Sequence, residues 1–159
     1  MFVEEILKKA EEKGINVIDV ILKELDKIDP EESIRLRLNL AEKYFKEARE
    51  FIDKGDPIQA SEKLYKVAEE LIKLLAELYD TPEYEEFKKE GRWYTYKLQS
   101  TSLFLSKKLG DWVRRGWDTG YILDVWGFHE GKLSIDYIKE VIRDIEIMLE
   151  NTRKLTQKN

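Results

Sequence analysis

His129 and Glu130 are the side chains in this sequence best suited to acid–base chemistry, and they lie in the glycine-flanked run Gly127-Phe128-His129-Glu130-Gly131. An imidazole titrates near neutral pH, and an adjacent carboxylate can fix which ring nitrogen carries the proton. We therefore take His129 and Glu130 as the candidate catalytic residues. The alternative, which we favour, is that His129 is structural and caps or bridges helix ends.

Metal and cofactor chemistry have little support in the sequence. Asp124, His129, Glu130 and Asp136 could gather around a divalent ion, but one histidine and no compact ligand motif do not define a site. The signatures GxxxxGK[ST], GxGxxG, GxSxG and HExxH are absent, so P-loop, Rossmann, hydrolase and zinc-peptidase chemistry are not indicated. We expect no metal and no cofactor.

Aromatic and basic side chains gather in the second half of the chain. The tryptophans are Trp93, Trp112, Trp117 and Trp126. They could stack on a nucleobase or another planar ligand, although packing in a core or a dimer interface is the interpretation we favour. Arg114 and Arg115, close to Lys107 and Lys108, could contact a phosphate, but a solvated charged face is the simpler interpretation.

Composition limits the classes of function. The 159 residues carry 28 basic and 33 acidic side chains, a net charge of -5, which argues against a broad nucleic-acid-binding face. Apolar runs are too short to span a bilayer, and the first residues carry acids where a signal peptide would be apolar. The absence of cysteine favours a cytoplasmic location. The Lys- and Glu-rich composition favours a thermophile protein.

Helix-starting signals recur along the chain. Each of the three prolines follows a residue that can cap a helix, in the pairs Asp29-Pro30, Asp56-Pro57 and Thr81-Pro82. Together with apolar residues at helical spacing, they predict helices over residues 2–13, 16–28, 30–54, 56–78, 81–90, 94–109, 111–126 and 134–155, with a turn at 127–131. Residues 56–78 are apolar on more than one side, which predicts the central helix.

These helices predict one all-α domain over residues 1–159. A helical hairpin at residues 1–28 docks on a bundle core at residues 30–155, and the helix at 81–90 is a short insertion. Gly116 and Gly120 lie one turn apart in the predicted helix 111–126, where each costs about 0.5 to 1 kcal/mol relative to alanine. We expect close packing by another helix or a dimer partner to offset this cost.

The runs KGDPIQASEKLYKVAEELIKLLAE, GRW and WGFHEGKLS resemble the archaeal PaREP family of small helical proteins and, more distantly, HEPN-type bundles. The resemblance covers residues 31–155. It implies an up-and-down antiparallel four-helix bundle that is commonly dimeric. In HEPN ribonucleases an arginine lies four to six residues before a histidine, whereas the positions five to seven before His129 hold Asp124, Leu123 and Ile122.

Two functional hypotheses follow. The first is a non-enzymatic, homodimeric interaction module that uses the aromatic half of the chain, with no membrane association. The alternative is a HEPN-type ribonuclease or nucleotide-binding protein centred on His129, a hypothesis that the missing arginine weakens.

Overall fold

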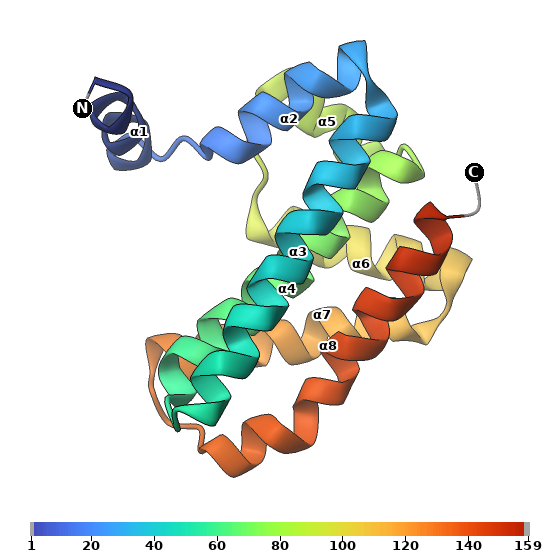
Figure 1. Ribbon diagram of the computed structural model, residues 1–159. Coiled ribbons are helices and arrows are strands. Elements are labelled where there is room, and N and C mark those ends of the chain that lie inside the picture. The colour runs from blue at the N-terminus through green and yellow to red at the C-terminus, as the bar shows by residue number, and fades with distance from the viewer. Residues whose placement is uncertain (1, 158–159) are drawn as a thin grey trace.

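The computed structural model describes residues 2–157, which form eight α-helices, one π-helical segment and no strand (Figure 1). The elements are α1 (Phe2–Glu12), α2 (Val17–Ile28), α3 (Pro30–Asp53), α4 (Pro57–Leu78), α5 (Pro82–Glu90), α6 (Thr95–Leu109), α7 (Asp111–Ile122), η1 (Leu123–His129) and α8 (Ile135–Thr156). The predicted all-α class is confirmed. Within residues 2–157, every helix is too short or too polar to cross a membrane.

The helix starts follow from the capping residues in the sequence. The side chains of Asp29, Asp56 and Thr81 each accept a hydrogen bond from the backbone N–H three residues later, at 3.2, 3.0 and 3.2 Å. Such bonds satisfy N–H groups that have no partner inside the helix. Gly55, at a φ of 73°, ends α3, and Asp56 starts α4, so these two helices form a tight antiparallel hairpin.

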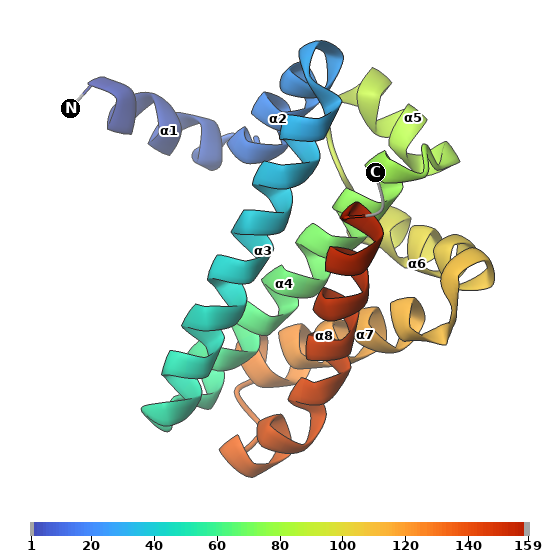
Figure 2. The ribbon, with the colours of Figure 1, turned by 45° about the vertical axis from the view of Figure 1, so that its right-hand side comes forward.

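α4 is the central helix of the bundle. Its buried apolar residues are Ala60, Leu64, Val67, Ala68, Leu71, Ile72, Leu74, Leu75 and Ala76, each with no exposed surface. It contacts α3, α5, α6, α7, η1 and α8. Figure 2 shows α3 beside α4, with α8 in front of α7. The wide apolar surface of α4 is therefore covered from several directions.

Two glycines of α7 let it pass close to its neighbours. A Cβ atom on Gly116 would lie 2.5 Å from Sδ of Met148 in α8, and one on Gly120 would lie 2.7 Å from Cβ of Ala68 in α4. Contacts this short exclude any side chain without repacking. Both glycines therefore serve the packing of α7 within its own chain.

The predicted turn at 127–131 differs from the structure in its first half, because residues 123–129 continue from α7 as the π-helix η1. Gly127 lies directly on α4, where a Cβ atom would be 2.1 Å from Oγ of Ser61. The chain turns away only after Glu130, at Gly131, which has a φ of 61°. No regular pattern in the sequence announces a π-helix, so the wider winding was not predicted.

Of the two N-terminal helices, only the second docks on the bundle. α2 packs on α3 and buries Leu22 and Asp19, whereas none of the residues of α1 is buried. Figures 1 and 2 both show α1 extending away from the body of the molecule. α1 is thus an amphipathic helix whose apolar face contacts little of its own chain.

Candidate functional site

The π-helix brings His129 close to Asp124. Because η1 is wound more widely than an α-helix, residues five apart share a face, and Nε2 of His129 lies 3.5 Å from Oδ1 of Asp124. The His129 side chain is 62% exposed, so solvent and ligands can reach it. Glu130, the other candidate catalytic residue, is also exposed and follows η1 directly.

The electrostatic surroundings of this pair are acidic. The pKa of Asp124 is raised, first by burial and further by Glu62, while the charge of protonated His129 opposes the rise. The pair combines an imidazole with a carboxylate. The cation that would stabilise negative charge on a reacting phosphate is not part of it. Among residues 2–157, no group of three or more acidic or histidine side chains could hold a metal ion.

The four tryptophans lie in separate environments. Trp117 is fully buried and its Nε1–H donates to Oε1 of Gln99 at 2.7 Å. Trp93 stacks on Phe87 with ring centroids 5.3 Å apart. Trp112 is half-buried and donates to the Leu109 carbonyl, whereas Trp126 in η1 is 51% exposed. These side chains do not form one stacking surface, and three of them are largely occupied by packing within the chain.

Arg114 and Arg115 project from α7 beside acidic residues. Both line a shallow depression that Asp111, Asp118 and Asp144 also line. The Nε atom of Arg114 lies 3.8 Å from Oδ2 of Asp118. The carboxylates offset the positive charge that a phosphate would need.

A buried ionic cluster joins α2 to the bundle. It consists of Asp19, Arg37, Glu70 and Lys73, whose residues are between 2 and 5% exposed. The carboxylate of Asp19 accepts from Nη1 of Arg37 at 3.0 Å and from Nζ of Lys73 at 2.8 Å. Nη1 of Arg37 also donates to Oε1 of Glu70 at 2.6 Å. α2 therefore supplies a carboxylate to two buried cations, one on α3 and one on α4.

The charges in the ionic cluster depend on one another. Burial alone would lower the pKa of Lys73, but Glu69, Glu70 and Asp19 outweigh it, so the pKa is raised. Removing a single partner from such a group leaves an uncompensated buried charge. This cluster was not predicted from the sequence. The available signal was that Glu70 and Lys73 interrupt the widest apolar stretch of α4, where a charge needs a buried partner.

A second polar group, the carboxyl cluster, connects the far end of α2 to α3, α4 and α5. Tyr84 donates to Oδ2 of Asp26 at 2.8 Å, and Ser33 donates to Oε1 of Glu77 at 3.2 Å. Oε2 of Glu77 is buried with no charged or hydroxyl donor among the described residues. Burial, and secondly the neighbouring Asp26 carboxyl, raise the pKa of Glu77 to about 8.

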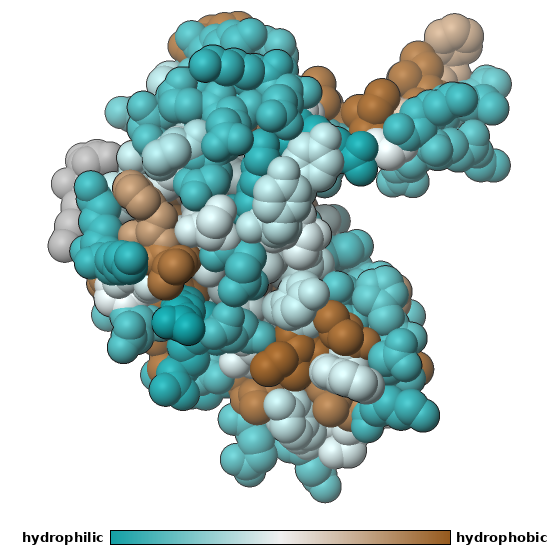
Figure 3. Space-filling model, turned by 180° about the vertical axis from the view of Figure 1, so that it is seen from behind, coloured by the Kyte–Doolittle hydropathy of each residue, from teal (hydrophilic) through white to brown (hydrophobic). Residues whose placement is uncertain are grey.

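A groove of about 660 Å³ opens where α1 meets α2, and we call it the N-terminal groove. Leu7, Val17, Ile18 and Ile21 form its apolar wall, and Lys66 and Glu69 of α4 lie on its polar side. Figure 3, which views the molecule from behind, shows apolar side chains exposed along the projecting α1 helix. The same view shows a second apolar patch at the lower right, on the side where η1 lies.

The fold and these sites define a small helical protein with an added N-terminal layer, which consists of α1 and α2. The model of the archaeal PaREP1/PaREP8 family matches residues 36–149, and the chain belongs to this family. A crystal structure of a protein from Sulfolobus solfataricus is 34% identical, with a TM-score of 0.64, over 72% of this chain and 93% of that one. The comparison with curated proteins gives no match. The resemblance to the PaREP family is confirmed, and α1 and α2 precede the matched residues.

Proposed function

We propose that this protein is a non-enzymatic interaction module that forms a homodimer through its N-terminal layer. The observation that supports this most strongly is the uncovered apolar face of α1, where Phe2, Val3 and Ile6 are 77, 66 and 55% exposed. A continuous apolar face of this kind marks a protein–protein or membrane interaction site. The proposal retains the cytoplasmic location and thermophile source inferred from the composition.

The proposed surface differs from the one expected from the sequence. Self-association through the aromatic half would use the tryptophans together with Gly116 and Gly120. Trp117 and the two glycines pack against other parts of the same chain and have no free surface to offer a partner, whereas Trp126 is 51% exposed. The N-terminal layer offers α1 and the N-terminal groove together, which supports a dimer surface there.

Sedimentation of the purified chain at tens of micromolar tests this function. We expect a dimer, and we expect Ile6→Glu to weaken it because the charge would enter the apolar contact. Lys8→Glu is the matched control, since it adds the same side chain to the opposite, polar face of α1 and should leave the dimer intact. A monomer for the unaltered protein would refute the proposed function.

The alternative is a ribonuclease or nucleotide-binding protein in which α3, α4, α7 and α8 correspond to a HEPN-like four-helix core. The contact between His129 and Asp124 is the observation in its favour, because it provides a base beside an orienting carboxylate. Cleavage of single-stranded RNA in EDTA that His129→Ala abolishes would establish it. Absence of cleavage, together with no nucleotide-dependent shift in Tm, would remove it.

A further inference from the structure

The carboxyl cluster places two acids against each other where α2, α3, α4 and α5 meet. Asp26 of α2 and Glu77 of α4 are within hydrogen-bonding reach of each other, and both line a cavity of about 300 Å³. Oε2 of Glu77 is buried and has no donor among residues 2–157. Two carboxylates cannot hydrogen-bond to each other, because an ionised carboxylate only accepts. This contact between α2 and α4 therefore requires a proton.

Tyr84 of α5 holds Asp26 in place as an acceptor. Its hydroxyl donates to Oδ2 of Asp26 at 2.8 Å. Burial, and secondly this hydrogen bond, raise the pKa of Tyr84, so the hydroxyl stays protonated at neutral and mildly alkaline pH. The donor that Asp26 receives from α5 is therefore constant, and the protonation state that varies is that of Glu77.

Ser33 of α3 links the protonation of Glu77 to the backbone of α2. Its Oγ atom lies 3.2 Å from the carbonyl oxygen of Leu22 and 3.2 Å from Oε1 of Glu77. One hydroxyl hydrogen serves one of these acceptors at a time. An ionised carboxylate is the stronger acceptor, because its hydrogen bond is charge-assisted. Loss of the proton from Glu77 therefore draws the Ser33 hydroxyl away from α2.

We propose that the carboxyl cluster is a pH-dependent switch, which holds residues 22–28 of α2 on the bundle while Glu77 is protonated and loosens them when Glu77 ionises. Ionisation replaces the hydrogen bond between Asp26 and Glu77 by repulsion between two carboxylates. It also removes the Ser33 hydroxyl from the Leu22 carbonyl. The buried oxygen of Glu77 still lacks a donor, which favours a movement that admits water. This switch does not depend on the proposed homodimer.

The charges around the carboxyl cluster do not neutralise an ionised Glu77. From α3, Glu31 lines the same cavity, and Arg37 favours the ionised form but is already engaged in the ionic cluster. From α8, the lining residue is Thr156, which does not titrate. The other charges at this junction act on Asp26, have opposite signs and lie 4.0 Å apart: Asp80 and Lys88.

Hydrogen exchange of the α2 amides tests the switch in the unaltered protein. The pKa of Glu77 is about 8 when docked and near 4.5 when exposed, so the docked state holds an extra proton between these values and opening becomes easier as pH rises. We expect exchange of residues 22–28, divided by the intrinsic rate at each pH, to rise between about pH 5.5 and 8 and then level off. The rise should be below about tenfold per pH unit, because Glu77 is only half-buried.

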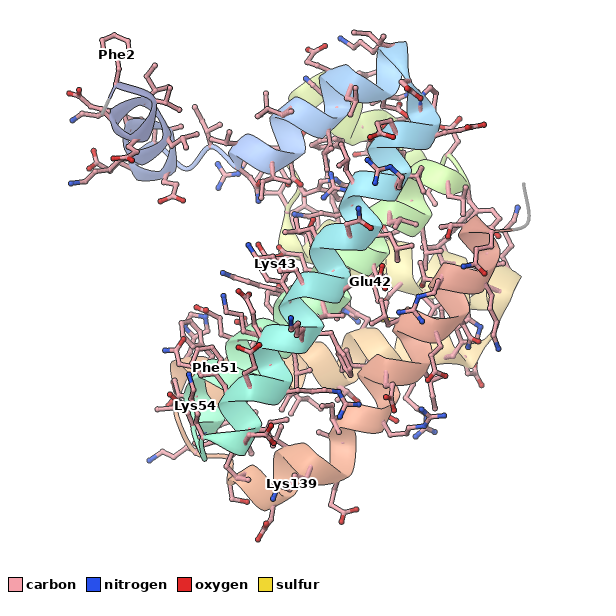
Figure 4. The ribbon with its side chains drawn as sticks, viewed as in Figure 1. Phe2, Glu42, Lys43, Phe51, Lys54 and Lys139 are labelled. Atoms are coloured by element: carbon pink, nitrogen blue, oxygen red, sulfur yellow. The ribbon has the colours of Figure 1, made fainter. Side chains whose placement is uncertain are left out.

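The amide of Lys139 is the internal reference. Lys139 lies in α8 at the opposite end of the molecule from α2 (Figure 4), so openings there leave the carboxyl cluster intact. Its normalised exchange should not rise with pH. An equal rise at Lys139 and in residues 22–28 would mean that the whole chain opens, and would overturn a switch confined to α2.

Two conservative variants complete the test. Glu77→Gln cannot ionise, and its amide can donate to Asp26 at every pH, so exchange of α2 should become independent of pH. Glu31→Gln is the matched control, because it removes a carboxyl group from the same cavity but outside the hydrogen bond, and it should keep the pH dependence of the unaltered protein. A dependence that survives in Glu77→Gln, or none in the unaltered protein, would overturn the proposal.

Discussion

Replacement of Asp19 by asparagine tests whether buried charges hold α2 on the bundle. The substitution keeps the shape of the side chain and removes its charge. Asp19 is 2% exposed and is within hydrogen-bonding distance of both Arg37 and Lys73. After the change, the two buried cations retain Glu70 as their one fully buried acid, and the ionic cluster gains an uncompensated positive charge.

The expected loss is about 3 kcal/mol in the free energy of unfolding, the low end of the range for breaking a buried ion pair. The helix can also detach instead of keeping the charge buried. Detachment exposes Leu22, at a cost of about 1.5 to 3 kcal/mol, and also the half-buried side chains of α2. Detachment of α2 would therefore compete with the docked state, in which the uncompensated charge stays buried.

Urea unfolding followed by tryptophan fluorescence measures the total loss, and native-state hydrogen exchange measures the opening of α2. We expect α2 amides to exchange much faster in Asp19→Asn than in the unaltered protein. Glu24→Gln is the control, because Glu24 is exposed on the same helix and pairs with Lys27 at 2.8 Å. A loss no larger than that of one neutral hydrogen bond, about 1 kcal/mol, would refute the argument.

Three further substitutions test other parts of the structure. The pKa of Glu77 is raised from near 4.5 to about 8, so between these values the folded chain holds a proton that the unfolded chain has released, and stability falls as pH rises. The free energy of unfolding should fall by at most about 1.4 kcal/mol per pH unit, and by less where Glu77 is partly solvated. Urea unfolding at several pH values across this range should show that Glu77→Gln removes this dependence. Gly120→Ala should lower the free energy of unfolding by about 1 to 3 kcal/mol, measured by heat or urea, because its Cβ would meet Ala68. Adding Ala68→Gly should restore most of the loss, and no recovery would contradict this contact. Gly127→Ala should push η1 off Ser61 and move the NMR resonances of η1, and unchanged resonances would show that the helix tolerates the added methyl group.

Much of the fold was predictable because the signals are local. Asp29, Asp56 and Thr81 start their helices as capping residues do in any chain, and the apolar width of α4 specified its central place. The π-helix was not predictable in this way. Gly127 of η1 lies against Ser61 of α4, two residues that are far apart in the sequence.

The candidate sites were less predictable than the helices. The sequence identified His129, but the approach of Asp124 requires the π-helix, whose winding no short pattern encodes. The ionic cluster joins Asp19 to Lys73, 54 positions later, and a charged residue in a helix gives no sign of whether its partner is water or a distant side chain. The sequence predicted that the helices at residues 2–13 and 16–28 dock together as a hairpin, and it did not show that the apolar face of α1 is left uncovered.

The ionic attachment of α2 gives this layer its own response to heat. Hydration of charged groups becomes less favourable as temperature rises, so the cost of burying Asp19, Arg37, Glu70 and Lys73 decreases. Hydrophobic contacts, which form most of the attachment between α4 and its other neighbours, gain less over the same interval. Warming should therefore strengthen the hold on α2 relative to the rest of the bundle, and cooling should loosen the N-terminal layer first.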